Sequence, residues 1–220
     1  MIDKELPQHI KWINAIVLVV MTILTVAAIA PWIAWKVDPA AHAYGWNRFS
    51  YFTVQSNFIA AITYLIAATA IFRRRKMGSW FRYLRGAAVL YMLVTGIVSA
   101  LLLRNAEVNP NPGEFNWNNF ILHEVGPLFI LIWWLLWPSR LPVSARNSLL
   151  WLVFPLLWTI YTFIRASMTG WYPYPFLDPA RAGGTIGVSG YVVGITVCFI
   201  LLSLLLAWIS RARANNHTLY

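Results

Sequence analysis

Charged residues are scarce in this chain. Of its 220 residues only 11% are charged and 60% are hydrophobic, and acidic side chains number just 7. Soluble domains carry roughly 25% charged and about 45–50% apolar residues. This composition excludes a soluble globular fold for the main body of the protein. The length leaves room for one compact bundle and for no sizeable soluble domain.

Cysteine is almost absent, and the basic residues do not form a nucleic-acid-binding pattern. The single cysteine, Cys198, lies within an apolar run. It cannot build an internal disulfide framework or a zinc site, so we interpret it as a small buried apolar residue. The net charge of +10 comes from Lys and Arg clusters at the ends of apolar runs. We therefore expect no nucleic acid partner.

What the chain has in abundance is apolar sequence, in six long runs. The shortest hold 18 uncharged residues, which reach about 27 Å as a helix, close to the hydrocarbon thickness of roughly 30 Å. Because lipid offers backbone groups no partner, these runs must be helices. We predict an all-α polytopic membrane protein whose single domain (1–220) is a bundle of six transmembrane helices. The predicted spans are about 12–35, 51–72, 86–103, 119–137, 148–168 and 185–209.

Basic residues divide unevenly between the two sides of these spans. The side that holds both termini has 12 Lys and Arg, and the other side has 5. The positive-inside rule then places both termini in the cytoplasm. The first run contains Ala28-Ile29-Ala30, which resembles a signal-peptide cleavage site. Its apolar residues continue through Trp35, so we interpret the run as a span.

The second run opens with an unusual density of polar side chains. Thr53, Ser56 and Asn57 share one face of a helix, because residues three and four apart are neighbours, whereas Gln55 points elsewhere. Polar side chains at membrane depth face the bundle interior or a wet cavity. We therefore expect this polar stripe to face inward.

Further polar residues are predicted at the same outer end of the bundle. His123 and Glu124 lie near the outer end of the fourth span, and Arg104 and Arg165 end the third and fifth. The proline-rich loop 169–179 closes over the same side. The sequence therefore predicts a one-sided pocket in the outer leaflet.

Thr53 and His123 are the residues of this set that suggest a reaction. A threonine hydroxyl needs a base within hydrogen-bond reach to become a nucleophile, and histidine is the usual base near neutral pH. Asn119, Asp178 or Glu124 could be the third, orienting group, and the spacing does not choose among them. Hydrogen bonds that only pack helices together are the alternative explanation.

The arginines of this region also have two interpretations. Arg165 either snorkels to the headgroups or binds a carboxylate or phosphate at the pocket mouth. Glu124 is a candidate ion-pair partner for Arg104 or Arg165. The residues that we predict to bind substrate or to stabilise an oxyanion are Gln55, Ser56, Asn57, Arg104, Asn119, Glu124, Arg165, Tyr172, Tyr174 and Asp178.

Three stretches carry a resemblance to a known family. They are 51–57 (YFTVQSN), 119–127 (NFILHEVGP) and 170–178 (GWYPYPFLD). Together they resemble the bacterial Pr6Pr membrane proteins. These look like distant relatives of the androgen-induced and androgen-dependent six-span proteins of animals, which hydrolyse fatty acid esters of hydroxy fatty acids with an intramembrane threonine and histidine.

The resemblance implies roles for particular residues. The family threonine falls on Thr53 and the family histidine on His123, although the spacing from this histidine to the next proline is one residue shorter here. The Tyr-Pro-Phe-Leu segment that precedes an acidic residue corresponds to Tyr174 through Asp178. The resemblance also implies a multi-pass protein of the bacterial inner (cell) membrane.

Two functions fit these observations. The first is an intramembrane hydrolase of lipid-like carboxylic esters with a Thr53 nucleophile and a His123 base. The alternative is a non-enzymatic protein that binds a membrane lipid or amphiphile in the same pocket. A haem or metal role would depend on His123 and His42 alone, and we expect neither a cofactor nor a metal.

Overall fold

A computed structural model describes residues 7–34, 45–103, 115–137 and 142–218, and every regular element within these ranges is helical. Six of the described helices are long and apolar enough to cross a membrane. The prediction of an all-α, six-span membrane protein is thereby confirmed. The residue bounds of these candidate spans are Gln8–Ala30, Phe52–Phe72, Trp80–Leu103, Trp117–Leu136, Ala145–Thr169 and Gly184–Ala214.

The spans are built from long α-helices joined to short helical turns. The long helices are α1 (Gln8–Ala34), α2 (Phe52–Phe72), α3 (Trp80–Val98), α5 (Gly126–Leu136), α7 (Val153–Thr169) and α8 (Gly184–Thr218). The short elements are α4 (Trp117–Phe120), α6 (Ala145–Ser148), the 3₁₀ turns η2 (Gly45–Ser50), η5 (Leu149–Leu152) and η6 (Pro175–Leu177), and the π-helical turns η3 (Ser99–Leu103) and η4 (Ile121–Val125).

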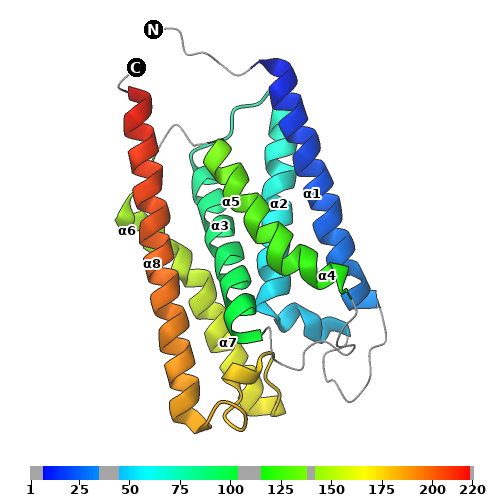
Figure 1. The fold of residues 1–220 in the computed structure, drawn as a ribbon, viewed down its shortest axis with the longest axis vertical. Coiled ribbons are helices and arrows are strands. Elements are labelled where there is room, and N and C mark those ends of the chain that lie inside the picture. Colours follow the sequence, from blue (N-terminus) through cyan, green and yellow to red (C-terminus); the bar gives the residue numbers. More distant parts are fainter. Residues whose placement is uncertain (1–6, 35–44, 104–114, 138–141, 219–220) are drawn as a thin grey trace.

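Helices α2 and α3 form the centre of the bundle (Figure 1). Helix α1 packs along α2, α2 packs on α3, and α3 contacts both α5 and α8. Helix α8 also contacts α6, η5 and η6. The start of α1 and the end of α8 lie at the same end of the molecule, and α2 and α4 begin at the opposite end. The cytoplasmic location of the shared end remains a prediction from the distribution of basic residues.

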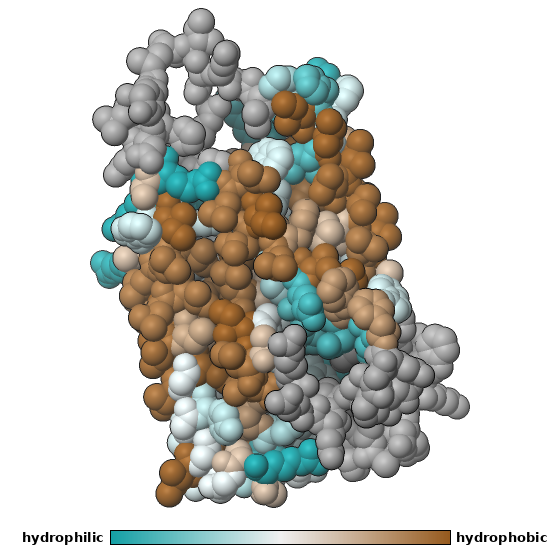
Figure 2. Space-filling view, viewed as in Figure 1, coloured by the Kyte–Doolittle hydropathy of each residue, from teal (hydrophilic) through white to brown (hydrophobic). Residues whose placement is uncertain are grey.

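The outer surface of the bundle matches a lipid environment. Large apolar side chains such as Ile23, Leu65 and Leu128 are exposed. Figure 2 shows a broad hydrophobic band on one face of the molecule, between more hydrophilic ends. A hydrophilic patch interrupts the band in the lower part of this face, where α4 and η4 lie. Hydrophilic side chains are therefore present at both ends of the bundle, and at the end remote from the chain termini they also extend into the hydrophobic band.

The third span begins earlier than its charges suggest. The helix starts at Trp80 and so includes Arg82 and Arg85, which the charge pattern placed in the preceding loop. Arg85 is only 7% exposed, and its guanidinium lies 5.1 Å above the ring of Trp133. A face-on aromatic contact of this kind attracts a cation. An arginine at a predicted boundary therefore belongs to the bundle interior.

Helix α7 ends at a glycine that turns the chain into the proline-rich loop. Gly170 has a φ of 67°, in the left-handed region, and its amide donates to the carbonyl of Ala166. Only glycine adopts this conformation without a steric penalty, which makes it the usual residue just beyond a helix. The loop that follows returns along the bundle end and brings Tyr174 to the start of α2.

We predict that Gly86→Ala lowers the thermal unfolding midpoint of the protein in detergent. A β-carbon at Gly86 would overlap the ring of Trp151, which is buried and cannot move aside freely. Overpacking of this kind costs about 1–3 kcal/mol. The matched control is Gly190→Ala, because a β-carbon there meets nothing within 4 Å. Equal midpoints for the two variants would contradict the packing of α3 on Trp151.

Candidate active site

The threonine and histidine that the sequence analysis paired are in contact. Thr53 lies in the first turn of α2 and His123 in the π-helical turn η4. The Thr53 Oγ1 atom is 3.2 Å from His123 Nε2. It is also 3.2 Å from the hydroxyl of Tyr174, which comes from the loop before η6. Three segments that are distant in the sequence therefore meet at one hydroxyl group.

The direction of each hydrogen bond in this cluster follows from one carbonyl group. His123 Nδ1 lies 3.1 Å from the backbone oxygen of Asn119, which can only accept. In the neutral imidazole Nδ1 must then carry the proton, and Nε2 is an acceptor. The Thr53 hydroxyl donates to Nε2, so the Tyr174 hydroxyl donates to Thr53 Oγ1. The orienting group of His123 is thus the main chain of Asn119, one helical turn earlier.

Tyr174 is held rigidly at the start of α2. Its side chain is buried, its ring stacks on Phe176 at 5.1 Å, and the edge contact with Tyr51 is 5.5 Å. Its hydroxyl oxygen accepts the backbone N–H of Thr53 at 3.2 Å, one of the free amides of the helix N-terminus. Burial raises the pKa of the Tyr174 phenol to about 12, against the opposing effect of its hydrogen bonds with Thr53. The phenol therefore remains a neutral donor at physiological pH.

Asn57 connects the turn of Thr53 to the turn of His123. The N–H of Gly126 donates to the carbonyl of Ile121, five residues earlier, as in a π-helix. In the same pattern residue 127 would donate to the carbonyl of Leu122, but Pro127 has no N–H. The Asn57 Nδ2 group fills this place: it donates to the carbonyl of Leu122 at 3.1 Å and to that of Thr53 at 2.9 Å. One amide group thereby fixes the distance between α2 and η4.

A close approach of α3 supports the same turn. A β-carbon at Gly96 would lie 3.2 Å from the carbonyl oxygen of His123 and 3.2 Å from the ring of Pro127. These separations are tighter than ordinary packing contacts, so the absence of a side chain at Gly96 lets η4 sit against α3. The backbone of His123 is therefore held by α2 on one side and by α3 on another.

Two other members of the polar stripe bond to the backbone. Ser56 Oγ donates to the carbonyl of Thr53 at 3.1 Å and contacts Thr95 Oγ1 at 2.8 Å. Gln55 Nε2 donates to the carbonyl of Phe49 at 2.6 Å and points away from Thr53 Oγ1, as its place on the helix predicts. The donors of Gln55, Ser56 and Asn57 thus serve the main chain, and the groups directed at Thr53 Oγ1 come from His123 and Tyr174.

The remaining predicted site residues make their contacts elsewhere. Arg165 donates to Asn47 Oδ1 at 2.6 Å and lies 4.6 Å above the ring of Trp171, so Glu124 is not its partner. Asp178 contacts Arg181 at 3.7 Å and accepts from the Ala180 amide at 3.0 Å. The side chains of Asn119 and Glu124 are exposed. The ring of Tyr172 packs edge-on against the ring of Phe163. Arg104 lies outside the described residues.

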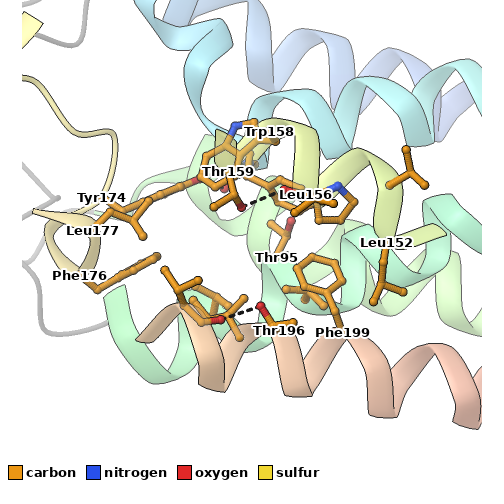
Figure 3. Close-up of a pocket in the computed structure, with 18 of the residues that line it drawn as sticks. Thr95, Leu152, Leu156, Trp158, Thr159, Tyr174, Phe176, Leu177, Thr196 and Phe199 are labelled. Atoms are coloured by element: carbon orange, nitrogen blue, oxygen red, sulfur yellow. Dashed lines mark hydrogen bonds between the residues drawn. The ribbon is translucent and has the colours of Figure 1, made fainter. Parts of the chain in front are cut away.

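An apolar cavity of about 400 Å³ reaches this cluster. Thr53 and Tyr174 belong to its wall. Figure 3 shows Leu156 and Trp158 of α7 on one side and Thr196 and Phe199 of α8 on the other. The hydroxyl of Thr196 bonds to a carbonyl of its own helix, which leaves the lining between α7 and α8 largely apolar. Thr53 therefore borders a space suited to a hydrocarbon chain.

Two residues of this region were missed at the level of sequence. Thr95 of α3 lines the cavity and, since Ser56 donates elsewhere, its hydroxyl donates to Ser56. Trp158 of α7 lines the cavity and donates its indole N–H to the carbonyl of Ser50 at 3.0 Å. Thr95 stands between the apolar Val94 and Gly96, and Trp158 lies in an apolar run whose aromatic residues are typical of any membrane span, so neither is marked by the sequence. Their roles depend on helices that meet only in three dimensions.

The described residues contain no group of three or more His, Cys, Asp and Glu side chains that could hold a metal ion. Comparison of the chain with protein-family models, with curated proteins and with solved structures found no match. The arrangement of Thr53, His123 and Tyr174 therefore has to be interpreted from its own chemistry.

We predict that Asn57→Leu destabilises the protein by about 1–3 kcal/mol, because a buried carbonyl of Leu122 loses its donor. Thermal unfolding in detergent measures the change. Asn119→Ala is the matched control: its side chain is exposed and its backbone carbonyl still holds His123. That variant should change stability by less than about 0.5 kcal/mol. If both asparagine variants unfold at the wild-type temperature, Asn57 does not connect the two turns.

Proposed function

We propose that this protein is an intramembrane hydrolase of lipid-like carboxylic esters, with Thr53 as the nucleophile and His123 as the general base. The observation that carries the proposal is the 3.2 Å contact between Thr53 Oγ1 and His123 Nε2, at the wall of an apolar cavity. A hydroxyl that donates to an imidazole, whose other nitrogen is held by a third group, is the arrangement that activates alcohols for acyl transfer, and here the third group is the Asn119 carbonyl.

The substrate class follows from the surroundings of the hydroxyl. The cavity lies between two membrane-spanning helices, and its lining is largely apolar. An acyl chain fits such a space, and a molecule that resides in the bilayer would enter between α7 and α8. The resemblance to the androgen-induced and androgen-dependent six-span hydrolases supports the same substrate class, a long-chain carboxylic ester.

In the acylation step the acyl group passes from the alcohol oxygen of the ester to Thr53 Oγ1, and the proton of Thr53 passes through His123 to the leaving alcohol. Thr53 Oγ1 attacks the ester carbonyl carbon while its proton passes to His123 Nε2. The carbonyl π electrons move to the oxygen and form a tetrahedral oxyanion. When this intermediate collapses, the bond to the alcohol oxygen breaks and His123 gives its proton to the leaving alcohol. The product is an acyl ester of Thr53.

The deacylation step repeats these transfers with water. His123 takes a proton from a water molecule as the water oxygen attacks the acyl carbon. Collapse of the second tetrahedral intermediate breaks the bond to Thr53 Oγ1, which recovers its proton from His123. The carboxylic acid leaves, and the starting hydrogen bonds are restored. A positioned base of this kind accelerates such a step by about 10²–10⁴-fold.

We assign oxyanion stabilisation to two donors beside Thr53. The backbone N–H of Thr53 and the hydroxyl of Tyr174 lie 3.2 Å apart, and the hydroxyl is also 3.2 Å from Thr53 Oγ1. When Oγ1 becomes bonded to carbon, the Tyr174 hydroxyl turns its proton from Oγ1 toward the new oxyanion, and the Thr53 N–H becomes available as the Tyr174 oxygen moves away from it. Gln55, Ser56 and Asn57 keep their bonds to the backbone throughout.

We expect a fluorophosphonate probe to label the pure protein at Thr53, as peptide mapping by mass spectrometry would show. The Thr53→Ala and His123→Ala variants should lose both this adduct and hydrolysis of a long-chain p-nitrophenyl ester. Thr159→Ala is the matched control, because Thr159 lines the same cavity and bonds only to its own helix. A folded wild-type protein that binds the ester saturably without turnover would replace the hydrolase with a lipid-binding protein.

We further expect Tyr174→Phe to lower kcat by about 100-fold with little change in KM. A donor that acts on the oxyanion contributes to the transition state and not to substrate binding. Tyr172→Phe removes a hydroxyl from the same loop, two residues away, without touching Thr53. Its kcat should equal that of the wild type. Equal kcat values for Tyr174→Phe and the wild type would remove Tyr174 from the mechanism.

A further inference from the structure

The cavity beside Thr53 is elongated along the fifth span. Its lining there includes Trp158, whose indole N–H donates to the Ser50 carbonyl just before α2, and extends back to Leu152 and Leu149 in η5. The stretch from Trp158 to Leu149 corresponds to at most about 14 Å of helix. Figure 3 shows Leu152 at the end of the cavity that is remote from η6. The cavity therefore leads from the start of α2, where the nucleophile lies, to η5.

The turn η5 closes this end of the cavity and is held from two sides. Ser148, one turn before Leu152, accepts a hydrogen bond from Ser203 of α8 at 3.0 Å, and both serines are buried. The carbonyl of Trp151 accepts from the hydroxyl of Tyr91 in α3 at 2.7 Å. Because α3 and α8 both bond to this segment, the closed end, which we call the floor, resists displacement by a ligand.

The side of the cavity is bounded by two helices that meet at its ends. Helix α8 contacts the fifth span through α6 and η5 at one end of the cavity and contacts η6 at the other. Between these contacts lie Leu156 of α7, which is exposed on the lipid-facing surface, and Thr196 and Phe199 of α8. An acyl chain that enters between the two helices and lies along the cavity meets the floor end-on at Leu152.

We propose that Leu152 sets the length of the acyl chain that the cavity accepts. The inference rests on the proposed ester hydrolysis, because the reacting carbonyl lies at Thr53 and so fixes one end of the chain. An extended chain advances about 1.2 Å per bond, so the stretch to η5 holds up to about twelve bonds. Each methylene group buried on the way increases affinity about fourfold. A longer chain has to displace Leu152 or leave carbon atoms outside the cavity.

Hydrolysis of a homologous series of p-nitrophenyl esters tests the floor with the full-length protein in detergent. The series runs in even-numbered steps from butyrate to palmitate, and kcat/KM is measured for each ester. The wild type should improve with chain length up to laurate at most and decline toward palmitate. Leu152→Ala should move the optimum to a longer ester, with about a tenfold gain for that ester, the value expected when two more methylene groups are buried.

A second variant changes the floor in the opposite direction. Leu152→Phe should move the optimum to a shorter ester, because the larger ring takes up part of the cavity. The matched controls are Leu150→Ala and Leu150→Phe, since Leu150 lies in the same turn, is 64% exposed and is not part of the cavity lining. Both controls should keep the wild-type optimum. If one Leu152 variant does not fold, the other still decides the test.

Fatty acid binding separates a failure of the floor from a failure of the hydrolase. In Thr53→Ala, which cannot form an acyl ester, displacement of a fluorescent fatty acid by fatty acids of the same lengths measures occupancy without turnover. A length preference that shifts when Leu152→Ala is added, in a protein without esterase activity, would support the floor and remove the hydrolase.

The remaining outcomes count against the floor. Ester hydrolysis with the same optimum in both Leu152 variants as in the wild type would keep the hydrolase and overturn the role of Leu152. An equal shift in the Leu150 variants would also overturn it, since the effect would then not come from the cavity. No binding and no hydrolysis at any chain length would overturn both proposals.

Discussion

The carbonyl of Leu122 lies inside a membrane-spanning helix. In the π-helical pattern its hydrogen bond would come from the N–H of residue 127, but that residue is a proline and has no N–H. Lipid cannot supply a hydrogen bond there, so the donor must come from another helix. The amide of Asn57 supplies it and binds the carbonyl of Thr53 at the same time. The alignment of α2 with η4 depends on this bridge, and with it the contact between Thr53 and His123. The π-helical turn, the proline and the asparagine act as one structural unit.

The two ends of the bundle differ in how their polar groups are satisfied. At the end remote from the termini, each donor around Thr53 has an acceptor, and the hydrogen bonds run in a single direction from Tyr174 to the Asn119 carbonyl. At the other end, the indole N–H of Trp133 and the hydroxyl of Tyr64 are buried without a hydrogen-bond partner among the described residues. The first arrangement favours proton transfer along a fixed path.

The sequence was sufficient for the six spans, which follow from the long apolar runs. It suggested that Thr53 and His123 meet, because both are polar residues at the same end of the bundle and the family resemblance falls on the same two positions, and they are in contact. It could not choose the group that orients His123, since that group is a main-chain carbonyl and leaves no trace in side-chain patterns. Charge counting also placed Arg85 in a loop, because burial above an aromatic ring depends on tertiary packing. The sequence predicted a pocket at this end, but not that α7 and α8 line it, because Thr159 and Thr196 are isolated in apolar runs and bond to their own helices.

The absence of a carboxylate beside His123 has an electrostatic consequence. A Ser-His-Asp arrangement has a permanent negative charge, and such a charge at membrane depth needs a counter-ion or costs several kcal/mol. Here a backbone carbonyl does the orienting, so the resting set of Tyr174, Thr53 and His123 is electrically neutral. Charge arises only in the proposed transition state, as an imidazolium and an oxyanion of opposite sign in direct proximity. Such a site can be kept inside a bilayer at little cost between turnovers.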